Sequence, residues 1–185
     1  MSDEDQLRRL LLERSVRRGD FVLASGQRSP YYIDCRPSTM SAEGMVLIGR
    51  MGLAAIRAAG WKPSAIGGLT MGADPVAYAI AAASHGTDLM IDAFSVRKEA
   101  KGHGTGQPIE GNFRPGQQVV VVEDVITSGG SAQKAIDAVT RAGAKVLGVL
   151  AVVDREQGGR QLLEGSCIDV VSLTTASRLG LTPRE

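Results

Sequence analysis

Two adjacent carboxylates and a short turn rich in glycine and hydroxyl groups are the part of the chain best suited to chemistry. Glu123 and Asp124 follow the apolar residues 119–122, and two further apolar residues separate them from the turn 127–131. The turn reads Thr-Ser-Gly-Gly-Ser and opens a predicted helix, so free backbone N–H groups and the positive end of the helix favour a phosphate group. The carboxylates can accept hydrogen bonds from the hydroxyl groups of a sugar that carries this phosphate. The sequence therefore predicts a sugar-phosphate site.

An ordinary buried strand before a capped helix is the alternative interpretation of this stretch. Burying two adjacent acids at the end of a core strand would then cost desolvation free energy that no ligand contact offsets. The carboxylate pair could also contribute to a metal site, but only if other oxygens complete the coordination shell. No side chain is assigned as a metal ligand.

Two further groups of charged residues are candidates for binding anions. Residues 97–116 are rich in glycine, lack periodicity and exceed the usual length of a structureless connection, which is typical of a lid over a binding site. They carry Arg97, Lys98, Lys101 and His103, although a solvated charged loop is the alternative. Arg155, at the end of a predicted strand, can bind a carboxylate through two hydrogen bonds. Its alternative is a surface salt bridge.

Alternating strands and helices are expected to position these residues. Apolar strands separated by helices favour a mainly parallel sheet with helices on both faces. The predicted strands are residues 65–69, 89–96, 119–122, 145–154 and 168–173, and the predicted helices are 41–59, 75–84, 131–142 and about 160–163. The fold class is α/β, and ligands are expected beyond the carboxyl ends of the strands.

A smaller unit is expected before this sheet. Residues 3–18 have apolar side chains at helical spacing, and short strands at 21–23 and 31–35 form a hairpin-like hood. The whole chain, 1–185, is expected to be one domain, with the hood at about 1–40 and the core at about 41–175.

Composition excludes several classes of protein. The chain has 21 basic and 20 acidic side chains, which does not resemble a nucleic-acid binder. No apolar run approaches the roughly 20 residues needed to span a bilayer, and the acidic N-terminus does not resemble a signal peptide. Cys35 and Cys167 are expected to be two buried thiols in a reducing compartment, so the protein is expected in the cytoplasm.

The stretch around Glu123 and Asp124 resembles the phosphoribosyl-pyrophosphate motif of type I phosphoribosyltransferases. The family pattern is an apolar run, two acids, two apolar residues and then Thr-Ser-Gly-Gly-Ser, and all of it is present. The resemblance implies that the two acids hold the ribose hydroxyl groups. It implies that the 5-phosphate binds to the turn, Thr127, Ser128, Gly129, Gly130 and Ser131, and that Val125 and Ile126 also belong to the phosphoribosyl-pyrophosphate site.

Two other segments resemble the orotate phosphoribosyltransferases within this family. Residues 97–104 are similar to their mobile catalytic loop, and residues 21–34 to their N-terminal hood. The resemblance implies a lid whose cationic residues, Arg97, Lys98, Lys101 and His103, bind the activated sugar and act in catalysis. It implies that orotate contacts Thr127, Arg155 and the hood residues Tyr32 and Ile33.

The implied reaction transfers ribosyl 5-phosphate from 5-phosphoribosyl 1-pyrophosphate to orotate, with Mg²⁺ as cofactor, in pyrimidine biosynthesis. The resemblance also implies a homodimer in which the lid of one subunit reaches the site of the other. The glycine-rich loop 67–72 resembles the family's pyrophosphate loop. Many members have lysines where this chain has Ala24 and Gly72, and no residue is assigned to replace them.

Two alternative functions remain open from the residues. A purine or uracil phosphoribosyltransferase would share the fold, but neutral bases do not need an arginine that faces a carboxylate. A noncatalytic regulator that senses phosphoribosyl pyrophosphate would keep the phosphate motif, but it could lose the lid and should have a basic face.

Overall fold

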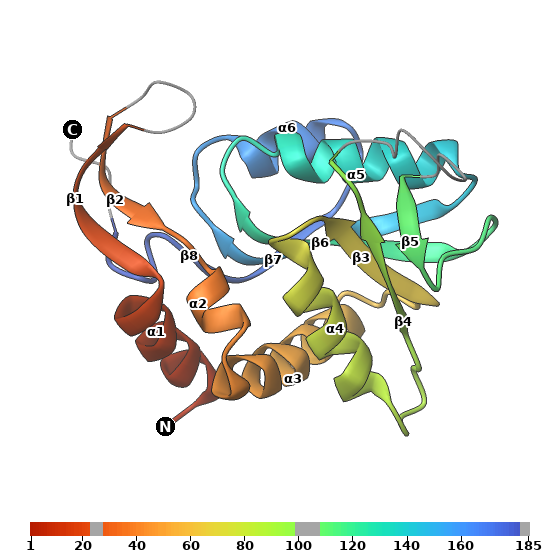
Figure 1. Ribbon diagram of the computed structural model, residues 1–185, viewed down its shortest axis with the longest axis horizontal. Helices are drawn as coiled ribbons and strands as arrows, with labels where there is room; N and C mark the ends of the chain where they lie inside the picture. The colour runs from red at the N-terminus through yellow and green to blue at the C-terminus, as the bar shows by residue number, and fades with distance from the viewer. Residues whose placement is uncertain (23–27, 99–107, 182–185) are drawn as a thin grey trace.

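The computed structural model describes residues 1–22, 28–98 and 108–181. Ala24, Lys101 and His103 therefore lie outside the described residues. Within these ranges the chain forms a six-stranded sheet, a separate two-stranded sheet and flanking helices (Figure 1). The helices are α1 (Asp3–Arg14), α2 (Arg36–Thr39), α3 (Ala42–Ala58), α4 (Ala73–Ser84), α5 (Gly130–Arg141) and α6 (Gly159–Gly165).

The large sheet is mainly parallel, as predicted. Its strands are β3 (Ala65–Leu69), β4 (Asp92–Val96), β5 (Ile109–Gly111), β6 (Gln118–Ile126), β7 (Lys145–Asp154) and β8 (Val170–Thr175). They follow the order β5-β4-β3-β6-β7-β8, and all neighbours are parallel except the edge pair of β4 and β5. The ends of β3, β6 and β7 therefore meet at the same edge of the sheet.

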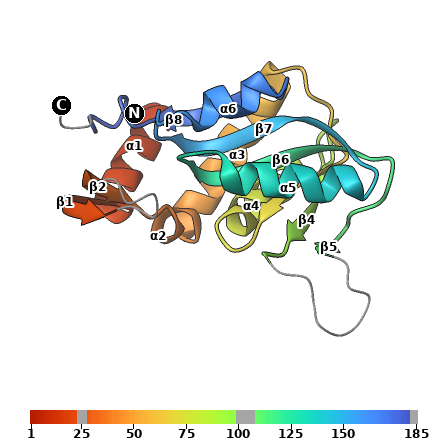
Figure 2. The same cartoon turned by 90° about the horizontal axis from the view of Figure 1, so that it is seen from above.

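Helices cover both faces of this sheet, so its strands alternate between two cores. Val120 and Val122 pack with helices α1, α3 and α4, whereas Val119 and Val121 pack with α5 and α6. Figures 1 and 2 show α5 and α6 on one side of the sheet and α3 and α4 on the other. Because each face of β6 is buried, its four valines form one continuous apolar run.

The predicted hood is the antiparallel pair of β1 (Val16–Val22) and β2 (Arg28–Ile33). The prediction of a helix through residue 18 is wrong, since α1 ends at Arg14. Residues 16–18 pair with residues 31–33 of β2 instead, and the buried Ser15 hydroxyl bonds that of Ser38 at 2.6 Å. Strand pairing thus overrides the apolar spacing that continued to Val16.

Three further expectations differ from the structure. The strand β6 continues to Ile126, so Glu123 and Asp124 lie within it and not beyond its end. The predicted lid contains β5, which pairs with β4 as an edge strand. Cys167 is exposed, in contrast to the buried Cys35, and both are free thiols.

Among the described residues, no helix is both long and apolar enough to cross a membrane.

Candidate active site

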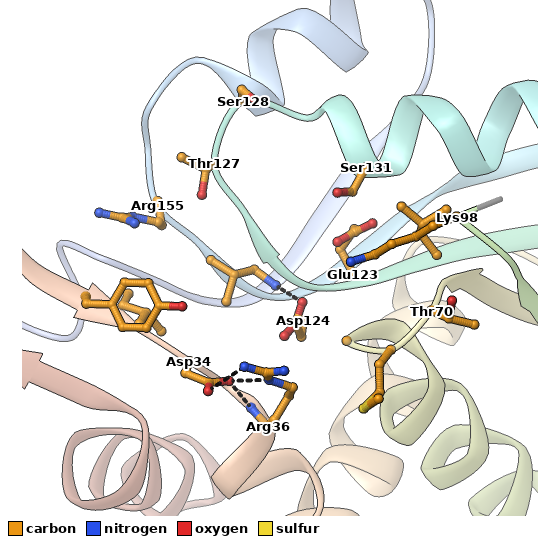
Figure 3. A pocket seen from close by; sticks show the side chains of 16 residues that line it. Asp34, Arg36, Thr70, Lys98, Glu123, Asp124, Thr127, Ser128, Ser131 and Arg155 are labelled. Atoms are coloured by element: carbon orange, nitrogen blue, oxygen red, sulfur yellow. Dashed lines mark hydrogen bonds and ion pairs between the residues drawn. The ribbon is translucent and has the colours of Figure 1, made fainter. Parts of the chain in front are cut away.

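A cavity of about 480 Å³ lies at the carboxyl ends of β3, β6 and β7. The hood and α2 form its opposite wall (Figure 3). The lining residues come from five segments of the chain: Tyr32, Ile33, Asp34, Arg36, Leu69, Thr70, Met71, Gly72, Lys98, Glu123, Asp124, Val125, Thr127, Ser128, Ser131 and Arg155. The structure thus brings the predicted acids, the turn, Lys98, Arg155 and the hood residues together around one space.

The turn 127–131 has the form of an anion cradle. Gly129 adopts a left-handed conformation, with φ 80°, and precedes α5 without a side-chain cap. The first N–H groups of α5 are therefore available to a ligand. They face a smaller hollow of about 100 Å³ that is lined by all the turn residues together with Glu123, Val125, Ile126 and Ala132.

The two acids of β6 lie on different sides of the strand. Glu123 lines the small hollow beside the turn, whereas the Asp124 carboxylate packs against Gly72 on the side of α4. This follows from the alternation of side chains along a strand. A sugar placed across the end of β6 can therefore meet one carboxylate from each side, with its phosphate in the turn.

Both carboxyl groups are protonated more readily than in water. The pKa of Glu123 is raised to about 8, mainly by burial and also by the charge of Asp124, while Lys98 lowers it. Burial also raises the pKa of Asp124, although the Val125 N–H donates to its Oδ1 at 2.9 Å and opposes the shift. Glu123 Oε1 is buried and has no partner among the described residues. A hydroxyl donor from a ligand would supply that partner.

Ribose 5-phosphate is therefore expected to release a proton from the protein when it binds at pH 7. With a pKa of about 8, Glu123 is mainly protonated in the free protein. Hydroxyl donors favour the ionised form, so binding should release up to about one proton. Above pH 9 the release should disappear, because Glu123 is already ionised. Isothermal titration in buffers of different ionisation enthalpy measures this proton. The Glu123→Gln variant corrects for protons of the ligand itself, and equal release by both proteins would contradict the prediction.

Arg155 is a buried cation in the wall of the cavity, directly after the end of β7. Its side chain is 4% exposed, and its Nη2 donates to Ser29 Oγ at 3.3 Å. The guanidinium lies over the Tyr31 ring, 4.8 Å from the ring centroid. Its Nε has no acceptor among the described residues. No carboxylate pairs with Arg155 in the described part of the chain, so the predicted alternative of a surface salt bridge does not apply. Its geometry suits an anionic ligand.

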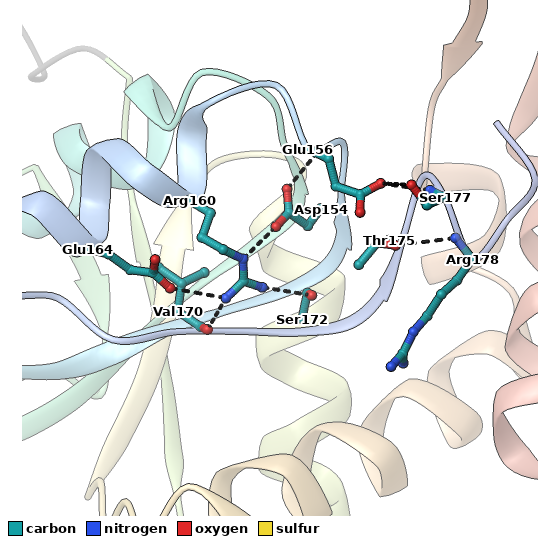
Figure 4. Close-up of polar contacts among 9 residues, drawn as sticks. All are labelled: Asp154, Glu156, Arg160, Glu164, Val170, Ser172, Thr175, Ser177 and Arg178. Atoms are coloured by element: carbon teal, nitrogen blue, oxygen red, sulfur yellow. Dashed lines mark hydrogen bonds and ion pairs between the residues drawn. The ribbon is translucent and has the colours of Figure 1, made fainter. Parts of the chain in front are cut away.

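The turn that carries Arg155 is held by a network of polar contacts (Figure 4). The buried Asp154 carboxylate accepts hydrogen bonds from the Glu156 N–H at 2.8 Å and from Arg160 Nε at 2.7 Å. Glu156 has a positive φ of 58°, and its side chain accepts hydrogen bonds from the backbone and hydroxyl of Ser177. The Arg155 N–H donates to Ile126 O at 2.9 Å, which ties this turn to the end of β6.

The predicted lid residues have different positions. Lys98 lines the cavity, and Figure 3 shows it beside Glu123. Arg97 does not line this cavity: its Nε lies 2.8 Å from Glu110 Oε1, in a neighbouring hollow with Asp74 and Tyr78. Lys101 and His103 lie outside the described residues.

Sequence analysis did not identify several residues around the cavity. Asp34 and Arg36 lie in its wall, and Ser29 and Tyr31 contact Arg155 from the hood. Gly159 supports the phosphate turn from behind, because its N–H donates to Thr127 O at 3.0 Å. Asp34 and Arg36 could have been found from the sequence, because an acidic and a basic residue two positions apart can form an ion pair. The other contacts join segments that are distant in sequence.

Comparisons with known proteins agree with this geometry. The phosphoribosyl transferase domain family matches residues 44–174. The orotate phosphoribosyltransferase of Rhodopirellula baltica is 46% identical over 178 residues, which are 94% of this chain and 92% of that protein. That of Aquifex aeolicus is 46% identical over 97% of this chain and 98% of its own.

A solved structure is also similar over nearly the whole chain. It is the orotate phosphoribosyltransferase of Mycobacterium tuberculosis in complex with 5-phospho-alpha-D-ribosyl 1-diphosphate. It is 40% identical, with a TM-score of 0.82, over 97% of this chain and 100% of that one. By its sequence, its sheet and the cavity at the end of β6, this chain belongs to the orotate phosphoribosyltransferases of the type I phosphoribosyltransferase family.

Proposed function

We propose that the protein transfers the ribosyl 5-phosphate group of 5-phosphoribosyl 1-pyrophosphate to orotate, in the cytoplasm and in pyrimidine biosynthesis. The observation that carries this proposal is one cavity whose wall contains both an anion cradle at residues 127–131 and a buried cation, Arg155. The cradle suits the 5-phosphate, Glu123 and Asp124 suit the ribose hydroxyls, and Arg155 suits the carboxylate of orotate.

The reaction exchanges one bond at C1 of the ribose. The bond from C1 to the pyrophosphate oxygen breaks, and its electron pair leaves with pyrophosphate. The N1 lone pair of the orotate anion forms the new bond, and the N1 proton is lost to solvent. Positive charge develops on the ribose and negative charge on the leaving group, so fixed cations near the pyrophosphate stabilise the transition state. We expect Lys98, Lys101 and His103 to supply them, and Arg97 to contribute if its pair with Glu110 opens.

The backbone positions the base in this proposal. Tyr32 and Ile33 line the cavity wall on β2, and Thr127 faces it from the phosphate turn. Backbone and hydroxyl groups of these residues can bond the ring while Arg155 binds the carboxylate. A pocket with a buried cation discriminates against neutral bases, since such a base leaves the cation without a partner.

The donor set fits Mg²⁺ as a cofactor held mainly by the substrate. The described residues contain no group of three or more side chains that could hold a metal ion. Mg²⁺ commonly takes one or two carboxylates and completes its shell with water and phosphate oxygens. Three carboxylates line the cavity, and Asp34 is paired with Arg36, which leaves Glu123 and Asp124 available to the ion. When bound, the ion would neutralise charge on the pyrophosphate.

The loss of orotate's ultraviolet absorbance on addition of 5-phosphoribosyl 1-pyrophosphate and Mg²⁺ tests the function. Uracil and hypoxanthine are assayed in parallel. Rapid, Mg²⁺-dependent turnover of orotate alone is the expected result. Turnover of a neutral base would instead indicate a different phosphoribosyltransferase. Tight sugar binding without turnover of any base would favour a noncatalytic regulator.

We also propose a homodimer that shares its lids. The helices α2, α3 and α4 contact one another, and several exposed apolar side chains lie on them or on the loops beside them: Met40, Met45, Val46, Met71 and Tyr78. Exposed apolar side chains that gather on one part of a surface favour association with another protein.

Mixing two inactive variants is expected to restore activity if the lids are shared. We expect Lys101→Ala to inactivate the lid and Asp124→Ala to inactivate the sugar site. Random exchange gives mixed dimers in which one of the two sites is intact, so activity should recover to about a quarter of the wild type. Each variant incubated alone is the control. No recovery after confirmed subunit exchange would contradict shared sites.

A further inference from the structure

Arg36 is a cation in the cavity wall to which sequence analysis assigned no role. It is the first residue of α2 and lines the cavity. Asp34 holds its side chain through two hydrogen bonds, from Arg36 Nε at 2.8 Å and from Nη2 at 2.9 Å. The Arg36 N–H also donates to Asp34 Oδ1 at 3.1 Å. Arg36 Nη1 donates no hydrogen bond to any described residue, and the Arg36 side chain is 48% exposed. The guanidinium is therefore fixed in direction and retains free donors.

The loop opposite Arg36 has no cation of its own. The end of β3 and the start of α4 contribute Leu69, Thr70, Met71 and Gly72 to the cavity. A side chain at residue 72 would displace the Asp124 carboxylate, since a Cβ atom would lie 2.5 Å from Asp124 Oδ1. Helix α4 begins after Gly72 without a side-chain cap, so its first N–H groups are available to an anion.

The other cations of the described cavity wall lie elsewhere. Arg155 is bound to the hood through Ser29, and Lys98 interacts with Glu123 on the side of α5. Arg36 instead lies on the side of Asp124, and the two groups interact through their charges. Figure 3 shows Arg36 between Asp34 and the loop that carries Thr70, next to Asp124.

We infer that Arg36 binds the pyrophosphate group of the activated sugar opposite the loop 70–72, and that Asp34 positions its guanidinium for this contact. This inference rests on the proposed function. With the 5-phosphate in the turn 127–131 and the ribose at Glu123 and Asp124, the pyrophosphate extends toward α4. A guanidinium with free donors suits a diphosphate, because its planar fork can bond two oxygens at once. Arg36 thereby supplies positive charge where Gly72 cannot.

Titrations with three ligands test this role without turnover. Arg36→Ala is expected to weaken the binding of pyrophosphate and of 5-phosphoribosyl 1-pyrophosphate by about 10- to 30-fold, the usual effect of a charge-assisted contact. The affinity for ribose 5-phosphate, which lacks the pyrophosphate, should change less than about twofold. Asp34→Asn should give a smaller loss with the same ligand pattern, because it releases the guanidinium without removing it.

Arg50→Ala is the matched control. Arg50 forms the same kind of two-bond pair with Asp3, with both distances 2.7 Å, and does not line the cavity. This variant should bind all three ligands as the wild type does. Should Arg36→Ala fail to fold, Arg36→Gln, which keeps hydrogen-bond donors without the charge, replaces it.

The outcomes separate this inference from the proposed function. Unchanged pyrophosphate affinity in Arg36→Ala would overturn the inference, and so would an equal loss for ribose 5-phosphate, which would indicate a structural role. Selective loss of pyrophosphate binding supports it. If that loss occurs while the wild type turns over no orotate, the proposed function fails and the role of Arg36 stands.

Discussion

Replacing Arg155 with alanine is expected to lower kcat/KM for orotate by about 100-fold or more. Truncating one partner of a buried, hydrogen-bonded charge pair costs about 2–5 kcal/mol, because the remaining charge loses its partner. In the proposed complex that charge is the carboxylate of orotate. Steady-state kinetics with varied orotate measure the loss.

The loss should be specific to the base. The affinity for ribose 5-phosphate should stay near the wild-type value, since Arg155 does not line the hollow formed by the phosphate turn. The preference for orotate over uracil should also narrow, because uracil lacks the carboxylate. The unfolding temperature should change little: the substitution removes the contact with Tyr31 but also removes a buried charge without a carboxylate partner in the described residues. Unchanged kcat/KM for orotate would exclude Arg155 from the base site.

Replacing Gly159 with alanine is expected to weaken the binding of ribose 5-phosphate by about 30-fold or more. A Cβ atom at residue 159 would lie 2.6 Å from Thr127 O and 2.7 Å from Gly129 N. Both atoms belong to the backbone of the phosphate turn, so the turn must move. Loss of one or two hydrogen bonds to a charged phosphate corresponds to about 2–4 kcal/mol. Isothermal titration measures the affinity.

Gly165→Ala provides the control in the same helix, α6. A Cβ atom at residue 165 meets nothing within 4 Å, so this variant should bind ribose 5-phosphate normally. Thermal unfolding of both variants distinguishes a displaced turn from a destabilised protein. If Gly159→Ala binds the ligand as well as Gly165→Ala does, the turn does not depend on its contact with α6.

The phosphate turn could be predicted because its signal is contiguous. The four valines of β6, the two acids and the turn 127–131 follow one another along the chain. Their backbone conformations depend mainly on neighbouring residues, as the left-handed Gly129 and the start of α5 show. The strand β3, the strand β7 and the helix α3 with its N-cap Ser41 were predicted for the same reason.

The boundaries that were wrong depend on partners distant in sequence. The end of α1 is determined by the pairing of β1 with β2. The strand β5 forms by pairing with β4. A helical spacing of apolar residues cannot reveal such competition, since strand pairing is a tertiary contact.

The sequence by itself determined the family, the mainly parallel sheet and the sugar-phosphate motif, because each is expressed in local order and periodicity. Only the tertiary structure decided which side chains surround the ligand. Arg155 meets Ser29 across 126 residues of sequence, and Arg36 of α2 faces Asp124 of β6 opposite Gly72. These contacts arise because the order of the strands brings the ends of β3, β6 and β7 to one edge, where the hood covers them. No pattern within a single segment contains that arrangement.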